Sequence, residues 1–222
     1  MITKEFLPKH ENIIIYQDDT MFRINTDTMA LGEFLYIYKK DKVLDIGTNT
    51  GALLLYASMF NPKELTGIDI NEKALELARK NMEVNNISNA KIIHADALTY
   101  KDQEFDVVIC NPPYFETDPK LLSLNSYKNL AKHEGNLNME NLVKCIRRNL
   151  KNHGTLFMLF QTSRLISLIE ELKKNKMIVK KLKFVYDENK DLSNVVLIKA
   201  VKGARPGITV EKPLIITRKE SI

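Results

Sequence analysis

The run Phe105–Cys110 constrains the fold most, because it has the composition of a buried strand and leads directly into Asn111-Pro112-Pro113-Tyr114. Two consecutive prolines each hold φ at about −65° and offer no N–H group, so the chain must leave the sheet stiffly there. Open α/β sheets bind their ligands at the carboxyl ends of strands. The amide of Asn111, a free carbonyl and the ring of Tyr114 would together suit a planar ligand that bears an NH2 group.

The rest of the 222-residue chain alternates strand-like and helix-like segments and suffices for one domain with a single core. The expected strands are 13–17 and 21–24 around a turn, then 42–46, 65–70, 91–95, 105–111, 155–160, 177–186 and 194–202. The expected helices are one capped within 25–28 and extending to Tyr38, then 52–57, one opened by Asn71, 139–150 stopped by His153-Gly154, and 163–175. The last two strands have no helix between them and must pair as an antiparallel hairpin. This pattern predicts a doubly wound α/β sheet with an antiparallel edge.

A glycine-containing turn, Gly47-Thr48-Asn49-Thr50-Gly51, joins the strand 42–46 to the next helix. Backbone can approach a ligand closely at such a turn. The spacing does not fit G-x-G-x-x-G, which disfavours a nicotinamide dinucleotide. From Asp45 onward it resembles motif I of class I S-adenosylmethionine-dependent methyltransferases, D/E-x-G-x-G-x-G, with Asn49 in place of the middle glycine. Asparagine tolerates positive φ better than most residues, so the turn can form.

Acidic residues stand at three successive strand ends, namely Asp45, Asp69 and Asp96. Asp69 occupies the position where a carboxylate accepts hydrogen bonds from ribose hydroxyls, although it could instead serve the N-terminus of the following helix. Asp96 could accept from the amino group of the cofactor's adenine, or be an ordinary loop residue. Taken together, the three acids and the turn predict S-adenosylmethionine as the cofactor.

The Asn111 motif predicts methylation of an amino group. The N6 amine of an adenine is a poor nucleophile because its lone pair is delocalised into the ring. Hydrogen bonds to Asn111 Oδ1 and the Pro112 carbonyl would favour a tetrahedral nitrogen, and Tyr114 would stack on an extruded base. The motif resembles N/D/S-P-P-Y/F of methyltransferases that act on adenine N6, guanine N2 or a glutamine amide, and by itself does not choose among them.

Three further segments resemble bacterial valine-tRNA (adenine-37-N6)-methyltransferases. They are Ile14-Ile15-Tyr16-Gln17 with Phe22 to Phe34, Asn129 to Glu134 with Lys132 in place of an arginine, and Lys202 to Gly207 followed by Pro213 to Ile216. The resemblance implies a Rossmann-like, mostly parallel seven-stranded sheet with a C-terminal hairpin. It implies a single domain over 1–222, in which 1–40 form an N-terminal strand pair and helix and 41–222 form the core.

The resemblance also implies roles for individual residues. Catalysis would fall to Asn111, Pro112 and Tyr114; cofactor binding to Thr26, Asp45, Gly47, Asn49, Gly51, Asp69, Ile70, Asp96, Ala97 and Asn111; and substrate binding to Arg23, Pro113, Tyr114, Lys132, His133 and Arg205. The substrate would be adenine 37 in the anticodon loop of a tRNA. Thr26 could instead cap a helix and His133 could be a surface residue. Lysine cannot make the bidentate phosphate contact of arginine, which puts an RNA contact at Lys132 in doubt.

Three alternatives remain open. A release-factor glutamine methyltransferase shares Asn-Pro-Pro-Tyr but carries a helical substrate domain before motif I, where about forty residues precede Val43 here. A ribosomal RNA guanine-N2 methyltransferase is less favoured because its motif usually ends in phenylalanine. A non-catalytic RNA-binding module on the same fold is disfavoured by the intact acid and glycine positions.

The composition sets the expected partners and compartment. A net charge of +5 favours a polyanionic partner, although abundant lysine could also reflect genome composition, and six lysines (173, 174, 176, 180, 181 and 183) could simply solvate an outer face. Cys110 and Cys145 show no zinc-binding spacing, so we expect no metal and a reducing compartment. No apolar run approaches a membrane span. We expect a cytoplasmic monomer that does not bind membranes.

Overall fold

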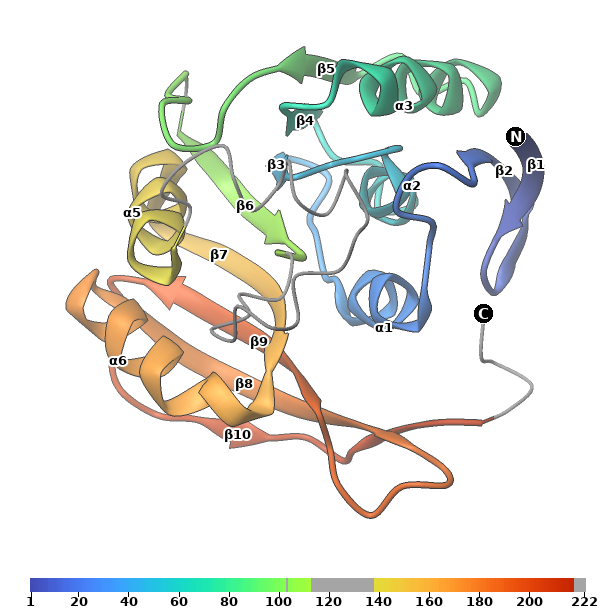
Figure 1. The fold of residues 1–222 in the computed structure, drawn as a ribbon. Helices are drawn as coiled ribbons and strands as arrows, with labels where there is room; N and C mark the ends of the chain where they lie inside the picture. Colours follow the sequence, from blue (N-terminus) through green and yellow to red (C-terminus); the bar gives the residue numbers. More distant parts are fainter. Residues whose placement is uncertain (103, 113–137, 218–222) are drawn as a thin grey trace.

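A computed structural model describes residues 1–102, 104–112 and 138–217 (Figure 1). Its central sheet has the order β10-β8-β9-β7-β6-β3-β4-β5, with β11 also paired to β8. The strands are β3 Lys42–Ile46, β4 Glu64–Asp69, β5 Ala90–His94, β6 Phe105–Cys110, β7 Leu150–Gln161, β8 Met177–Asp187, β9 Val195–Lys202, β10 Thr209–Val210 and β11 Leu214–Ile216. The neighbouring strands β7, β6, β3, β4 and β5 are parallel. The strand β9 runs antiparallel to both β7 and β8.

This arrangement confirms the predicted α/β sheet and its C-terminal hairpin. The seven expected core strands are present in the described residues, and two short strands extend the sheet beyond β8. At two and three residues, β10 and β11 are too short to show an alternating pattern in the sequence.

Helices cover both faces of the sheet because side chains alternate between the faces along each strand. The helices are α1 Thr26–Phe34, α2 Ala52–Ser58, α3 Glu72–Val84, α5 Met139–Asn149 and α6 Leu165–Lys174, the last preceded by the short helix η2 Thr162–Arg164. On β3, Val43 belongs to the core under α1 and α2, whereas Leu44 belongs to the core under α5 and α6. Two apolar layers therefore enclose the parallel strands. Figure 1 shows α1 and α2 on one side of the sheet and α5 and α6 on the other.

The N-terminal hairpin corrects one prediction. Its strands are β1 Ile2–Leu7 and β2 His10–Asp18, paired antiparallel, whereas residues 21–24 form no strand. The turn between β1 and β2 is made by Pro8 and Lys9, and Lys9 has φ of 66°. The side chain of Gln17 in β2 accepts a hydrogen bond from Ile24 N–H at 2.6 Å, which holds Ile24 beside the hairpin without a strand pairing.

Asn81 on α3 and Asn85, the C-cap residue of α3, hold the hairpin against the rest of the protein. Asn81 accepts from Tyr16 N–H at 2.7 Å and donates to the carbonyls of Tyr16 and Thr50 at 3.0 and 2.9 Å. Asn85, one helical turn later, exchanges the same kind of bonds with the backbone of Ile14. Each amide therefore satisfies a backbone N–H and carbonyl of β2 that no neighbouring strand would pair.

Other boundaries differ from the predictions for local reasons. The helix predicted to reach Tyr38 ends at Phe34, because Leu35 turns to an extended conformation. The helix α5 ends at Asn149, and His153-Gly154 lies inside β7 rather than stopping the helix. His153 has φ of 61°, and the register of β6 against β7 shifts beside this segment. Of the helices in the described residues, none is long and apolar enough to cross a membrane.

Candidate active site at the carboxyl edge of the sheet

Four neighbouring strands bring the predicted site residues to one edge of the sheet. Ile46 pairs with Cys110 on β6 and with Ile68 on β4, so the residues that follow these three lie side by side. They are Asn111, the turn that begins at Gly47, and Asp69. Asp69 in turn pairs with His94 at the end of β5, two residues before Asp96. The structure therefore gathers the predicted motifs at the edge where such sheets bind ligands.

The turn after β3 has the conformation that its sequence predicts. Gly47, Asn49 and Gly51 all have positive φ, of 74°, 48° and 82°, which confirms that Asn49 takes the place of a glycine. A Cβ atom on Gly47 would meet no described atom within 4 Å, so this part of the turn faces open space. Asn49 Nδ2 donates to the Phe22 carbonyl at 2.6 Å. The turn is thereby tied to the segment that leads into α1.

Asp69 joins the two loops on either side of it. One carboxylate oxygen accepts from Asn49 N–H and the other from Asn71 N–H, both at 2.9 Å. Burial raises the pKa of Asp69, and these backbone hydrogen bonds oppose the rise. The cap of α3 is Asn71, whose side chain accepts from Ala74 N–H at 3.4 Å. Since each oxygen of Asp69 has a second lone pair, the carboxylate can still accept from a ligand hydroxyl.

Asp45 is a fully buried carboxylate, and neither of its oxygens has a hydrogen-bond partner among the described residues. Burial raises its pKa to about 7, and the neighbouring Asp69 adds to the rise. The Thr48 hydroxyl lies near enough to oppose this rise but not in hydrogen-bonding geometry. Buried acceptors in proteins are normally paired, so this site calls for a donor from beyond the described residues. The amino and hydroxyl groups of S-adenosylmethionine, the predicted cofactor, fit that requirement.

The segment after β5 is held by a residue that the sequence analysis did not single out. Arg148, in the last turn of α5, donates to the carbonyls of Ala97 and Tyr100 at 3.1 and 2.8 Å. Asp96 is exposed, and its Oδ1 accepts from Leu98 N–H at 2.8 Å. A basic residue at a helix C-terminus would be expected to interact with its own helix, so the sequence carried no signal for this longer contact.

Two more predicted site residues, Ile70 and Pro112, directly follow Asp69 and Asn111 in the chain. Ile70 is 39% exposed, and its carbonyl accepts a hydrogen bond from His94 Nε2 at 2.8 Å. Asn111 is partly exposed and Pro112 is buried. Pro113, Tyr114, Lys132 and His133, together with the loop predicted over 115–137, lie outside the described residues.

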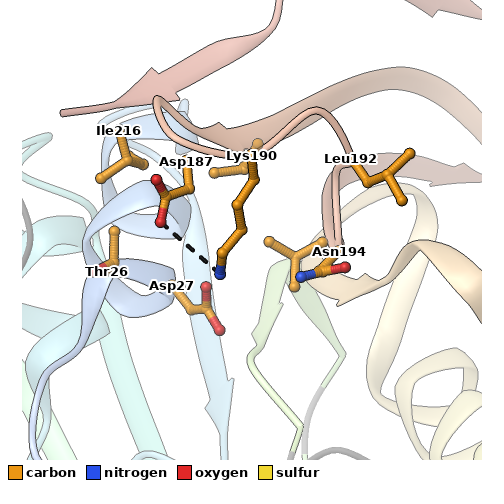
Figure 2. A pocket seen from close by; sticks show the side chains of 9 residues that line it. Thr26, Asp27, Asp187, Lys190, Leu192, Asn194 and Ile216 are labelled. Carbon is orange, nitrogen blue, oxygen red and sulfur yellow. Dashed lines mark ion pairs between the residues drawn. The ribbon is translucent and has the colours of Figure 1, made fainter.

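Thr26 lines a different pocket, between the start of α1 and the loop that joins β8 to β9 (Figure 2). This pocket of about 280 Å³ is floored by Val185, Val195 and Ile216. In Figure 2, Lys190 extends between Asp187 and Asp27, and its Nζ lies 3.9 Å from the Asp187 carboxylate. Thr26 follows Phe22, whose carbonyl accepts from Asn49 of the turn, by four residues, and its role in cofactor binding stays a prediction.

Of two further predicted substrate residues, Arg23 is held in ion pairs and Arg205 lies apart from Asn111. Arg23 forms ion pairs with Glu5 and Asp19 of the hairpin segment, and the hydrogen bond to Glu5 raises the pKa of its guanidinium. Arg205 follows Lys202, the last residue of β9. Because β9 runs antiparallel to β7, its end lies at the amino edge of the parallel strands, opposite Asn111.

The doubly wound sheet, the turn after β3 and the acids beside it together define a Rossmann-like methyltransferase fold. The crystal structure of the M. jannaschii tRNA m1G37 methyltransferase shares this fold, with a TM-score of 0.65 and 14% identity over 92% of this chain and 57% of that one. Residues 37–199 match the methyltransferase domain family. The chain belongs to that family.

Curated relatives match shorter stretches. A tRNA1(Val) (adenine(37)-N6)-methyltransferase of Flavobacteriaceae bacterium strain 3519-10 is 29% identical over 114 residues, which are 50% of this chain and 49% of the relative. A release factor glutamine methyltransferase of Fusobacterium nucleatum is 43% identical over 56 residues, 24% of this chain and 16% of the relative. The chain spans about half the length of the first tRNA methyltransferases that it matches.

Proposed function

We propose that this protein methylates the N6 amino group of an adenine in a tRNA anticodon loop, namely adenine 37 of a valine tRNA, with S-adenosylmethionine as methyl donor. One observation carries the proposal: the cofactor turn and Asp69 stand at the same sheet edge as Asn111 and Pro112, on directly neighbouring strands. Several relatives are tRNA1(Val) (adenine(37)-N6)-methyltransferases, which supports the choice of tRNA adenine.

The cofactor would rest on the turn that runs from Gly47 to Gly51. Asp69 would accept from its ribose hydroxyls, Asp45 would receive a donor in its buried position, and Ile70 and Asp96 would flank its adenine. When bound, S-adenosylmethionine supplies an electrophilic methyl group on a sulfonium centre.

The residues at the end of β6 would hold the substrate amine. Asn111 Oδ1 would accept one N–H of the amino group and the Pro112 carbonyl the other, which directs the nitrogen lone pair out of the ring plane. Gain of a methyl group makes this nitrogen positively charged and acidic, so it loses a proton to water without a strong general base. We place this reaction in the cytoplasm, and both cysteines in the described residues are free and buried, as a reducing compartment allows.

A release-factor glutamine is the second candidate substrate, because the Fusobacterium nucleatum relative has the higher identity over its short match. One experiment distinguishes between the two candidate substrates. The protein is incubated with labelled S-adenosylmethionine and either an unmodified tRNA1(Val) transcript or a release factor, and the products are digested and analysed by mass spectrometry. We expect N6-methyladenosine from the tRNA. Label in the release factor alone would overturn the proposed substrate.

A further inference from the structure

Three lysines of β8 and β9 lie on one face of the sheet and those of α6 lie on the other face, a difference that the sequence could not show. Register shifts between Val179 and Lys181, so Lys180 lies at an irregularity of β8. Beyond it, Lys181 pairs with Lys199 and Lys183 pairs with Leu197 on β9. Leu197 belongs to the core under α1, so these three lysines share the α1 face. Lys173 and Lys174 instead lie on α6, which packs on β8 from the other face through Leu168 and Leu172 (Figure 1).

Lys181, Lys183 and Lys199 form a cationic cluster that weakens the sheet. Like charges placed directly opposite each other on neighbouring strands are destabilising, and Lys181 faces Lys199 in this way. Lys199 is partly buried, with its Nζ 5.6 Å from the centre of the Phe157 ring, and burial together with Lys181 lowers its pKa. Groups with perturbed pKa values are common at functional sites, and structural ion-pair networks perturb pKa values as well.

Within the described part of the chain, Glu211 is the acid that interacts with these three lysines. Glu211 Oε1 lies 2.6 Å from Lys181 Nζ, and the pKa of Glu211 is lowered by that hydrogen bond and further by Lys183 and Lys199. The side chain of Lys181 remains 45% exposed even in this ion pair. The cluster therefore carries an excess of positive charge at a surface that solvent reaches.

One lysine of the cluster, Lys183, lies at the same level along the strands as Asn111, the proposed reaction site. Cys110 pairs with Met158, so the next residue, Asn111, lies level with Leu159, and Leu159 pairs with Leu197, which pairs with Lys183. Lys183 is thus three strands from Asn111, a distance of about 14 Å across the sheet. Leu159 and Leu197, which lie between the two positions, are buried in the core under α1, so an RNA strand that reached both Asn111 and Lys183 would run over α1 rather than along the sheet.

We propose that Lys181, Lys183 and Lys199 bind phosphates of the RNA strand that flanks the target adenine. This inference rests on the proposed function, because it takes RNA as the substrate that reaches Asn111. Glu211 partly neutralises the cluster and so limits the affinity for RNA.

Equilibrium binding of an unmodified tRNA1(Val) transcript, measured by fluorescence anisotropy at several salt concentrations, tests the proposal. The variant is Lys181→Gln/Lys183→Gln/Lys199→Gln, and the matched control is Lys173→Gln/Lys174→Gln/Lys176→Gln, which removes the same charge from and beside α6. We expect the cluster variant to bind tRNA at least about tenfold more weakly, and the salt slope of log Kd to fall by about two to three. The control should stay within about twofold of the wild type. Equal behaviour of the two variants would overturn the proposal.

A variant that raises the positive charge of the cluster distinguishes RNA binding from a purely structural role of the ion pair. Glu211→Gln removes the acid and should tighten tRNA binding, whereas loss of a merely structural ion pair would leave affinity unchanged or weaken it. If Lys199→Gln impairs folding, judged by urea unfolding and by calorimetry with S-adenosylmethionine, the double variant Lys181→Gln/Lys183→Gln carries the test. Failure of the proposed function would look different: the wild type would form no N6-methyladenosine in tRNA. Failure of this inference would leave methylation intact and both lysine variants alike.

Discussion

Asp45 should make the protein without cofactor less stable as pH rises, and replacing it should remove that loss. Its pKa is about 7 in the folded protein, against an ordinary value of 3.8. At a pH between these two pKa values, the Asp45 carboxyl holds a proton in the folded state that it has released in the unfolded state. The unfolded state then binds fewer protons, so the free energy of unfolding falls as pH rises. A difference of about three in pKa corresponds to about 4 kcal/mol above pH 7.

The variant Asp45→Asn keeps the shape of the side chain and removes its charge. Measured by urea unfolding without cofactor, it should match the wild type near pH 4 and exceed its free energy of unfolding by up to about 4 kcal/mol at pH 8. Its affinity for S-adenosylmethionine should fall, because the carboxylate acceptors are lost. A stability difference that does not change between pH 4 and pH 8 would refute the reasoning.

A second buried aspartate provides the control. Asp41 is also buried, but its Oδ2 accepts from Tyr38 N–H at 2.8 Å. Asp41→Asn weakens a hydrogen bond that exists, so it should lose about 1 kcal/mol of stability. Opposite signs for the two aspartates would show that the missing partner, rather than burial alone, sets the effect.

Three further changes test the architecture of the site. Asp69→Ala should raise the Kd for S-adenosylmethionine at least tenfold in calorimetry, and an unchanged Kd would remove it from the cofactor site. Gly51→Ala should cost about 1–2 kcal/mol in urea unfolding, because φ is 82° and the new Cβ would lie 3.1 Å from Met82 Cε. Asn81→Ala loses three hydrogen bonds to the backbone and should cost about 2–4 kcal/mol; hydrogen exchange should then rise first in β2, and uniform exchange across the sheet would contradict the clamp.

Features set by neighbouring residues could be predicted from the sequence. The positive φ of Asn49 follows from the spacing of the two glycines around it, and the cap by Asn71 follows from its place before an amphipathic run. The parallel strands followed from apolar runs of the right length between helices. The order of these strands in the sheet then determines which strand ends lie close together. It therefore determines that Asn111 lies at the same edge of the sheet as Asp69.

Features that depend on distant contacts could not be predicted. Asn81 serves a strand 65 residues earlier, and Arg148 holds a loop 48 to 51 residues earlier, so neither residue shows its role in its local sequence. Arg23 and Arg205 matched a pattern, but ion pairs and strand direction decide where their side chains lie. For the same reason, the lysines of β8 and α6 form one basic stretch in the sequence and two separate surfaces in the fold.

The most direct test of the account is methyl transfer to tRNA1(Val) by the wild type and by Asn111→Ala, with calorimetry of S-adenosylmethionine on both proteins. Nucleoside mass spectrometry should find N6-methyladenosine at position 37 with the wild type and none above background with the variant. The variant should bind the cofactor within about twofold of the wild type, because the proposed cofactor contacts come mainly from the turn between Gly47 and Gly51 and from Asp69, and Asn111 chiefly holds the substrate amine. Undiminished methylation by Asn111→Ala, or loss of cofactor binding equal to loss of activity, would contradict the account.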